Sequence, residues 1–377
     1  MKRSPDETHL IDRPSMLEEV MQVVASADEI ALDTEADSMH AYPEKICLLQ
    51  IRAQGNSWLV DPLADLDCSG LMEILSDKSL IFHAADYDLR LLYRRFHFRP
   101  RRVFDTMWAA RLVGYQRFGL EFLVKHFFDI QLEKGPQTAN WGLRPLTPSM
   151  AQYALNDVFF LHSLTDLLRK ELQDMGRLTW LNDICHRVVD QACRGEKDDS
   201  DIAWRLKGSQ KLTPRGLAFM KAIWLWREKE AVRANRPPFF VLTHDLVTLL
   251  SSKAALNEDW RASIPRKMSS RRRHELEKLI QSTGRLEMDQ FPQKLKHSRL
   301  RATDQEKMRA EELRQIRDKV ADELKLDPSI IASKALLTRL GLEHSSAKGE
   351  LMPWQRELLG LSLQGSSKTP DADKRSL

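Results

Sequence analysis

Short apolar runs separated by polar, turn-forming residues fill the first half of the chain. Five of them have the length and composition of strands, at residues 29–33 (EIALD), 46–51 (ICLLQI), 57–60 (SWLV), 80–84 (LIFHA) and 103–104. Apolar runs of this length between turn signals are typical of buried strands. We therefore predict five strands, of which the first three form an antiparallel meander.

Apolar residues with helical spacing occur between and after these strands. Leu89, Leu92 and Phe96 repeat at helical intervals, and residues 108–113 and 120–128 have the same periodicity. Thr147 followed by Pro148 is typical of a helix start, and the pattern behind it continues to about residue 172 as one long helix. This alternation predicts an α/β domain with a mixed five-stranded sheet flanked by helices.

The pattern changes near residue 195, where the polar stretch GEKDDSD begins. Beyond it the apolar spacing is helical throughout, first around residues 212–250 and again around 306–363, with a polar, basic connector at 291–303. We therefore predict an α/β domain at 1–195, a linker at 196–210, all-helical domains at 211–290 and 304–365, and a disordered tail at 366–377.

Composition excludes several classes of protein. Hydrophobic residues make up 42% of the 377 positions and charged residues 30%, and mean hydropathy is -0.44. No apolar run is long enough for a membrane span, and the first residues lack the apolar segment of a secretory signal. The four cysteines form no C-x-x-C pair and have no histidine at zinc-finger spacing. We therefore expect a cytoplasmic protein without a membrane partner, a disulfide framework or a zinc site.

Charge is distributed unevenly along the chain. The formal net charge is +4, but residues 1–200 carry 23 basic and 31 acidic side chains, whereas residues 201–377 carry 35 and 23. An acidic half joined to a basic half indicates one part that gathers cations and another that contacts a polyanion.

Carboxylates are placed where strands and helices should bring them together. Asp33 and Glu35 end the first strand two residues apart, so their side chains lie on one face. Another acid, Asp86 or Asp88, begins the helix after the fourth strand, where it could also serve only to favour the helix N-terminus. Carboxylates that converge in this way repel one another unless protons or cations neutralise them.

Tyr153 and Asp157 lie one helical turn apart and so share a helix face. Asp157 is surrounded in sequence by apolar residues, and a buried carboxylate there needs a partner, either a metal ion or a nearby arginine. Tyr153 alone could be an ordinary half-buried aromatic.

These residues lie in motifs that resemble the DEDD-type 3′→5′ exonucleases, in the branch that carries a tyrosine, and most closely the ribonuclease D family. The motifs are ALDTEAD at 31–37, CLLQI at 47–51, FHAADYDLRLL at 82–92, FDTMWAARLVG at 104–114 and YALNDVFFL at 153–161. In the helical half, WRLKG at 204–208 and residues 226–250 resemble the HRDC module (helicase and ribonuclease D C-terminal). The resemblance covers roughly residues 10–290, with a weaker HRDC-like unit at 304–365.

The resemblance implies an RNase H-like exonuclease fold with two divalent ions, Mg²⁺ or Mn²⁺, held by Asp33, Glu35, Asp88 and Asp157. It favours Asp88 over Asp86, because the family spacing from histidine to acid matches His83 and Asp88. Oxygen-only ligands suit these hard cations, and paired ions can stabilise both the attacking and the leaving oxygen of a phosphodiester. Tyr153 would orient the attacking water, since a phenol with its ordinary pKa is a poor base at neutral pH.

The implied activity is metal-dependent 3′→5′ exoribonuclease action that releases nucleoside 5′-monophosphates, in tRNA 3′ processing. The implied partners are tRNA precursors and other structured RNAs with single-stranded 3′ ends, and no obligate protein partner is expected. A DNA 3′→5′ exonuclease of the same superfamily remains open, as does an inactive nucleic-acid-binding protein. Residue chemistry alone does not separate RNA from DNA.

Nucleic-acid contacts are predicted at two places. Gln50 and His83 lie beside the proposed site and could contact the terminal nucleotide, although His83 fits a structural histidine equally well. Residues 261–301 hold 12 basic and 4 acidic side chains, and Arg271, Arg272 and Arg273 open a helix there. This cluster could bind phosphates or could simply be a solvated helix face.

Overall fold

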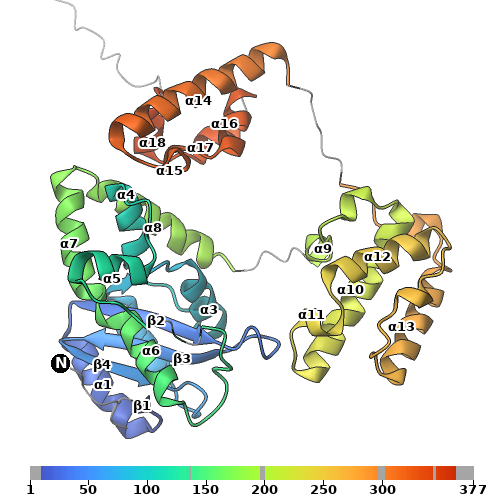
Figure 1. Ribbon diagram of the computed structural model, residues 1–377, viewed down its shortest axis with the longest axis horizontal. Coiled ribbons are helices and arrows are strands. Elements are labelled where there is room, and N and C mark those ends of the chain that lie inside the picture. Colours follow the sequence, from blue (N-terminus) through green and yellow to red (C-terminus); the bar gives the residue numbers. More distant parts are fainter. Residues whose placement is uncertain are drawn as a thin grey trace, which may run out of the picture.

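The computed structural model describes residues 10–133, 135, 137–195, 200–295, 302–342 and 345–361 (Figure 1). Its N-terminal part is built on one mixed sheet with strand order β1-β4-β3-β2-β5-β6. The strands are β1 (Leu10–Ile11), β2 (Glu29–Ala36), β3 (Ile46–Ala53), β4 (Asn56–Val60), β5 (Ser79–Phe82) and β6 (Arg102–Asp105). Strands β2, β3 and β4 form the predicted antiparallel meander. Strand β5 pairs in parallel with β2, β6 pairs in parallel with β5, and β1 pairs in parallel with β4.

The prediction of five strands was wrong, because the sheet has six. The additional strand, β1, is only two residues long and pairs in parallel with β4 at the edge of the sheet. The strand is defined by its pairing with β4, a distant segment of the chain that the local apolar pattern does not reveal.

The helices of this part are α1 (Pro14–Ser26), α2 (Ser69–Ser76), α3 (Asp86–Phe96), α4 (Thr106–Val113), α5 (Leu120–Phe128), α6 (Pro148–Phe159), α7 (Leu161–Asp174) and α8 (Leu178–Ala192). Helix α6 packs across β2, β3 and β4, while α7 packs on β2 and β5 (Figure 1). The predicted start of α6 is confirmed, since the Thr147 hydroxyl accepts a hydrogen bond from the Met150 amide and Pro148 is the first helical residue.

The single long helix predicted from residue 148 to about 172 is instead two helices. Phe160 ends α6 and begins α7 with a ψ of -7°. Both helices pack on the same sheet, so the apolar periodicity continues through the break and hides it from the sequence pattern.

The rest of the chain is helical where it is described. Its first segment contains α9 (Ser200–Ala203), α10 (Pro214–Ala234), α11 (Pro238–Val241), α12 (His244–Ala255) and α13 (Ser270–Thr283). Its second contains α14 (Asp304–Leu324), α15 (Pro328–Ile331), α16 (Lys334–Gly341), α17 (Ser345–Gly349) and α18 (Pro353–Leu358). Each segment has a hydrophobic core of its own. No helix among the described residues combines the length and the apolar character that crossing a bilayer requires.

The two helical segments repeat one succession of local structures. Helices α10 and α14 both have 21 residues and both end at a residue with positive φ, Asn235 and Lys325. A four-residue helix beginning with proline follows each, and a hydroxyl side chain, Thr243 or Ser333, caps the next helix. The second segment therefore follows the local plan of the first.

The second helical segment is joined to the α/β part by an apolar and a polar contact. The Trp354 ring stacks on Trp180 of α8, with centroids 4.6 Å apart. The Arg177 guanidinium donates to the carbonyl oxygens of Leu112 and Leu324, at 2.7 and 2.9 Å. Arg177 is buried, so each of these hydrogen bonds replaces one that water would make.

Gly114 lies within this interface, so a substitution at this residue tests the contact. It ends α4 with φ +116°, and a Cβ atom at this position would lie 2.8 Å from the carbonyl oxygen of Lys325. We expect Gly114→Ala to lower the free energy of unfolding by about 2 kcal/mol, through backbone strain and the clash together. Hydrogen exchange should accelerate in α14 and α15, where the contact is lost.

Gly55→Ala in the turn between β3 and β4 is the matched control, because Gly55 also has positive φ (+82°) but no atom lies within 4 Å of its Cβ position. Backbone strain alone should cost about 1 kcal/mol there, with no change of exchange in α14. Equal losses in the two variants would show that the contact with Lys325 has no energetic importance.

Candidate functional site

Three of the predicted site residues form one group. Asp33 and Glu35 of β2 and Asp157 of α6 each offer a carboxylate oxygen, and these oxygens all lie within 4.8 Å of one another. They come together because β2 directs Asp33 and Glu35 to one face of the sheet and α6 crosses that face. Segments more than a hundred residues apart thus supply one acidic cluster.

Asp88, the fourth predicted acid, lies beside this group. It is buried in the first turn of α3, and one of its oxygens accepts a hydrogen bond of 2.5 Å from the Thr34 hydroxyl of β2. The competing candidate, Asp86, is half exposed and paired with Arg90 one turn along the same helix. Of the two acids, only Asp88 has its charge directed toward the cluster.

Burial and mutual repulsion change the protonation of the four carboxylates. Burial is the largest cause, followed by the neighbouring acids, and together they raise the pKa of Glu35 to about 8 and that of Asp33 well above its ordinary value. Burial likewise raises the pKa of Asp88 and of Asp157 to about 7. Without a counter-ion the cluster therefore retains protons at neutral pH.

A divalent cation fits this arrangement. It would replace the retained protons as the neutralising charge, as metal ions do at carboxylate sites. The donor set consists of carboxylate oxygens, which suits hard cations such as Mg²⁺ and Mn²⁺ rather than zinc. The donor set of the cluster therefore fits a divalent cation.

Tyr153 is held next to Asp157 by contacts on both sides. Its hydroxyl lies close enough to the Asp157 carboxylate to lower the pKa of Asp157, and Gln137 opposes the rise in the pKa of the phenol. The backbone of Gly135 lies against its ring, where a Cβ atom would fall only 1.6 Å from Cδ2. Burial and the negative charge of Asp157 raise the pKa of the phenol above its ordinary value. Tyr153 therefore keeps its proton at neutral pH.

Asp105 supports the backbone around the site, and the sequence analysis did not identify it. It is buried at the end of β6 and accepts four backbone hydrogen bonds, from Ala84, Ala85, Met107 and Trp108, at 2.8–3.2 Å. Two of them cap α4, and the other two hold the turn before α3, where Ala84 has a φ of +67°. The signal for it was present: an acid between a short strand and a helix is a preferred N-cap. Its effect is to hold the start of the helix that carries Asp88.

Gln50 is directly opposite Asp33 on the neighbouring strand β3. It is completely buried, and within the described residues neither atom of its amide has a hydrogen-bond partner. A buried unpaired amide costs stability, about 1–3 kcal/mol for such a group. Its position beside the acidic cluster is consistent with a partner that arrives with metal or substrate, and the predicted nucleotide contact stays a prediction.

His83 is fixed by a structural hydrogen bond. The Thr106 hydroxyl donates to the carbonyl of Phe82 at 3.0 Å, so it accepts from His83 Nδ1, 2.9 Å away. Burial lowers the pKa of His83 to about 4, and the ring is neutral at pH 7. These contacts are those of the structural histidine considered above, and a nucleotide contact through Nε2 stays a prediction.

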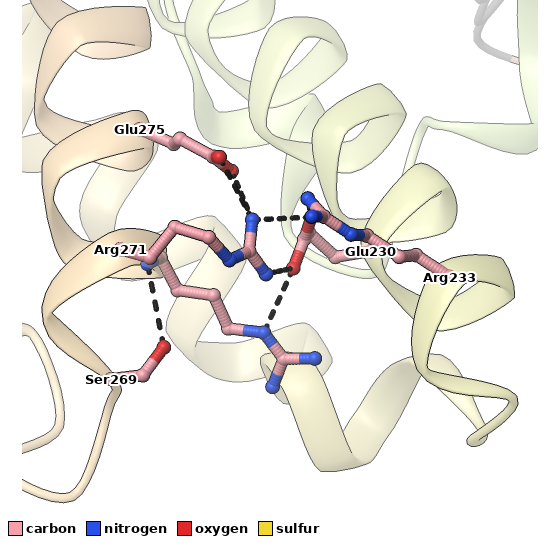
Figure 2. A network of polar contacts seen from close by, with 6 residues as sticks. Glu230, Arg233, Ser269, Arg271 and Glu275 are labelled. Carbon is pink, nitrogen blue, oxygen red and sulfur yellow. Dashed lines mark hydrogen bonds and ion pairs between the residues drawn. The ribbon is translucent and has the colours of Figure 1, made fainter.

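The predicted arginine cluster is occupied by an internal ion-pair network (Figure 2). Arg271 and Arg272 of α13 both pair with the buried carboxylate of Glu230 on α10, at 3.0 and 2.8 Å, and Arg271 also pairs with Glu275. Arg273 donates to the carbonyl of Pro265 at 3.0 Å. The network ties α13 to α10 and neutralises part of the charge that a phosphate would need, so binding of nucleic acid here stays a prediction.

Comparison with known proteins shows which proteins the chain is similar to. Residues 8–173 match a family model described as 3′-5′ exonuclease. A ribonuclease D of Zymomonas mobilis is 33% identical over 233 residues, 60% of this chain and 59% of that protein. A ribonuclease D of Pseudomonas paraeruginosa is 29% identical over 345 residues, 89% of this chain and 90% of that protein. The chain therefore carries a 3′-5′ exonuclease domain and is similar to ribonucleases D along most of its length.

The fold of the ribonuclease D family extends over nearly the whole chain. The crystal structure of Escherichia coli RNase D superposes with a TM-score of 0.74, at 23% identity, over 94% of this chain and 99% of that one. This likeness confirms the predicted α/β exonuclease fold followed by helices. The alignment with the Zymomonas mobilis protein, by contrast, spans less than two thirds of that protein's length.

Substitution of Asp105 tests its role as the anchor of α3. In Asp105→Asn the amide nitrogen would face the backbone N–H of Ala85 or of the α4 cap, so at least one buried hydrogen bond becomes a contact between two donors. We expect the free energy of unfolding to fall by about 2–3 kcal/mol in urea titrations. Asp67→Asn is the control, because Asp67 also accepts from a helical N–H, that of Ser69, but is fully exposed. If the urea concentration at half-unfolding were unchanged in Asp105→Asn, Asp105 would not anchor the start of α3.

Because the acids of the cluster repel one another when ionised, the stability of the metal-free protein should depend on pH. The raised pKa values mean that the folded state holds protons that the unfolded state has released between about pH 4 and about pH 8. The melting temperature in EDTA should therefore fall as pH rises through this interval, and saturating Mg²⁺ should reduce the fall. Asp33→Asn should flatten the EDTA profile and raise the melting temperature at about pH 8, whereas Asp86→Asn at the surface should do neither. A profile in EDTA that is as flat as the profile in Mg²⁺ would contradict the repulsion.

Proposed function

We propose that this chain is a metal-dependent 3′→5′ exoribonuclease that releases nucleoside 5′-monophosphates from RNA 3′ ends. The observation that carries the proposal is the convergence of Asp33, Glu35 and Asp157 within 4.8 Å, inside the segment that matches the 3′-5′ exonuclease model. Similarity to ribonucleases D supports the same activity.

Two divalent ions, Mg²⁺ or Mn²⁺, are part of the proposal. Asp33, Glu35 and Asp157 would hold them together with Asp88, whose carboxylate adjoins the group. Bound ions would lower the pKa of an attacking water and neutralise charge on the leaving oxygen. The chain contributes a rigid set of anionic oxygens on β2, α3 and α6, which needs little reorganisation when the ions bind.

Tyr153 would orient the attacking water. Its raised pKa keeps the phenol protonated at neutral pH, so the hydroxyl can donate or accept a hydrogen bond but does not serve as the base. The contacts with Gly135 and Trp141 fix the ring, the latter with centroids 6.2 Å apart. Loss of the hydroxyl should therefore slow the reaction without releasing the substrate.

The proposed substrates are structured RNAs with single-stranded 3′ ends, including tRNA precursors. The similar Escherichia coli RNase D is described as an exoribonuclease involved in structured RNA processing. The basic excess of residues 201–377 supports a role for the helical segments, proposed as HRDC-like units at 211–290 and 304–365, in holding the RNA backbone. All four cysteines are free and buried, which supports the proposed cytoplasmic location.

The proposal is tested by stepwise shortening of a 5′-labelled RNA in Mg²⁺ and in EDTA. Asp33→Asn and Asp157→Asn should reduce kcat by at least about 10³-fold, because each removes a ligand from the metal cluster. Tyr153→Phe should lower kcat by about 10–100-fold and leave KM nearly unchanged. Asp86→Asn, in the same helix turn as Asp88 but at the surface, should behave as wild type.

Matched RNA and DNA strands and a 3′-extended tRNA distinguish the alternatives. Faster shortening of the DNA strand would make the chain a DNA exonuclease. Absence of Mg²⁺-dependent shortening with any strand would make it a nucleic-acid-binding protein. Near-normal turnover of Asp157→Asn would overturn the assignment of the site.

A further inference from the structure

A cavity of about 220 Å³ lies between the loop from β2 to β3 and the end of α10. Asp37, His40 and Lys45 line it from the loop, Asn140 from the segment before α6, and Asn235 from the helical segment. Neither the acidic cluster nor Tyr153 forms part of its wall. It is therefore separate from the catalytic group and has one wall in each of two parts of the chain.

The cavity nevertheless adjoins the catalytic group through the chain itself. Asp37 follows Glu35 by two residues, a reach of about 7 Å in extended chain. Asn140 follows Gln137, whose side chain interacts with Tyr153, by three residues. The cavity is thus within reach of the nucleotides next to a 3′ end that is bound at Asp33 and Tyr153.

Hydrogen bonds inside the walls leave donors facing the cavity. The side-chain oxygen of Asn140 accepts from the Gly142 amide at 3.1 Å, and that of Asn235 accepts from the Tyr42 amide at 3.3 Å. A backbone N–H donates to an oxygen, so these bonds use the oxygen of each side-chain amide and leave its NH₂ group unpaired. Among the described residues, neither the Asn140 nor the Asn235 NH₂ group has an acceptor. Lys45 adds an ammonium group without an ion-pair partner in the described chain.

Asp37, the acid that lines the cavity, already accepts a hydrogen bond from the backbone of its own loop. Asp37 accepts the Lys45 amide at 2.7 Å, which uses one of its oxygens within the loop. Two amide NH₂ groups and an ammonium group around one cavity suit a ligand that offers several anionic oxygens. A phosphodiester has this character, and amide and lysine side chains are common partners of phosphates.

The two walls are fastened to each other and to the catalytic helix. The Tyr42 hydroxyl donates to Glu228 of α10. From the same loop, Glu44 accepts hydrogen bonds from Tyr87 and Arg94 of α3, both at 2.7 Å. Asn235 is therefore held over the loop by contacts that continue to the helix carrying Asp88.

We propose that this cavity binds a backbone phosphate of the RNA strand upstream of the scissile bond, with Asn235 as the contribution of the helical segment. The inference rests on the proposed exoribonuclease function and adds to it a second point of contact with the strand. Long strands would be held at both points, whereas the shortest substrates would reach only the catalytic group.

Asparagine-to-aspartate exchange tests the cavity with little change of structure. In Asn235→Asp and Asn140→Asp the oxygen that accepts the Tyr42 or Gly142 amide is kept, while the NH₂ donor becomes an anionic oxygen. With strands of about ten nucleotides, kcat/KM should fall about tenfold in each variant, mainly through KM. With the shortest strand that the wild type hydrolyses, kcat/KM should stay within about twofold of wild type.

Asn257→Asp is the matched control. Asn257 also has positive φ (+58°), and its oxygen accepts from Arg215, but it does not line the cavity. It should hydrolyse strands of every length as the wild type does. Melting temperatures of all three variants establish that each is folded.

The outcomes separate this inference from the function on which it rests. No Mg²⁺-dependent hydrolysis by the wild type would overturn the proposed function and the inference with it. Normal hydrolysis by Asn235→Asp and Asn140→Asp at every length would overturn the inference alone. An equal loss on short and long strands would also overturn it, because it would place these residues in catalysis or folding rather than in a distal subsite.

Discussion

The N-terminal part of the structure must hold several carboxylates close together although they repel one another. Asp88 is buried and Asp33, Glu35 and Asp157 are half-buried, and burial together with the charge of neighbouring acids raises the pKa of each. Such a cluster is unfavourable in an empty fold and becomes favourable when cations enter it. The sheet and its helices must therefore hold the cluster against a force that would separate its members.

The structure meets this requirement by fixing each carboxylate through its backbone element. Asp33 and Glu35 lie on β2 and both pair with β3, while β5 pairs with the preceding residues of the same strand. Helix α3 begins at a turn held by Asp105, and Thr34 contacts Asp88 directly. Helix α6 is clamped across three strands. Because hydrogen bonds and packing fix the backbone, the side chains have little freedom to move apart.

The helical segments use one local plan for two different purposes. In the first segment, the end of α10 presents Asn235 to the loop that follows β2, beside the proposed phosphate cavity. In the second, the corresponding end of α14 presents the carbonyl of Leu324 to Arg177, and Trp354 stacks on Trp180. The first contact lies beside the loop that follows β2, and the second joins α14 and α18 to α4 and α8. The same succession of helices can serve both because the residues at the ends of α10 and α14 meet different partners.

The sequence by itself determined the elements whose signals are local. Strands β2 to β6 followed from apolar runs, the start of α6 from Thr147 and Pro148, and the acids from their positions at the ends of these elements. Only the tertiary structure decided the two-residue strand β1 and the break between α6 and α7 at Phe160. It also decided which groups meet: the four backbone amides that bind Asp105, the pairing of Arg271 and Arg272 with Glu230, and the residues that line the cavity at Asn235. Each of these depends on groups far apart in the chain, and a pattern of neighbouring residues carries no information about which distant donor, acceptor or charge will face them.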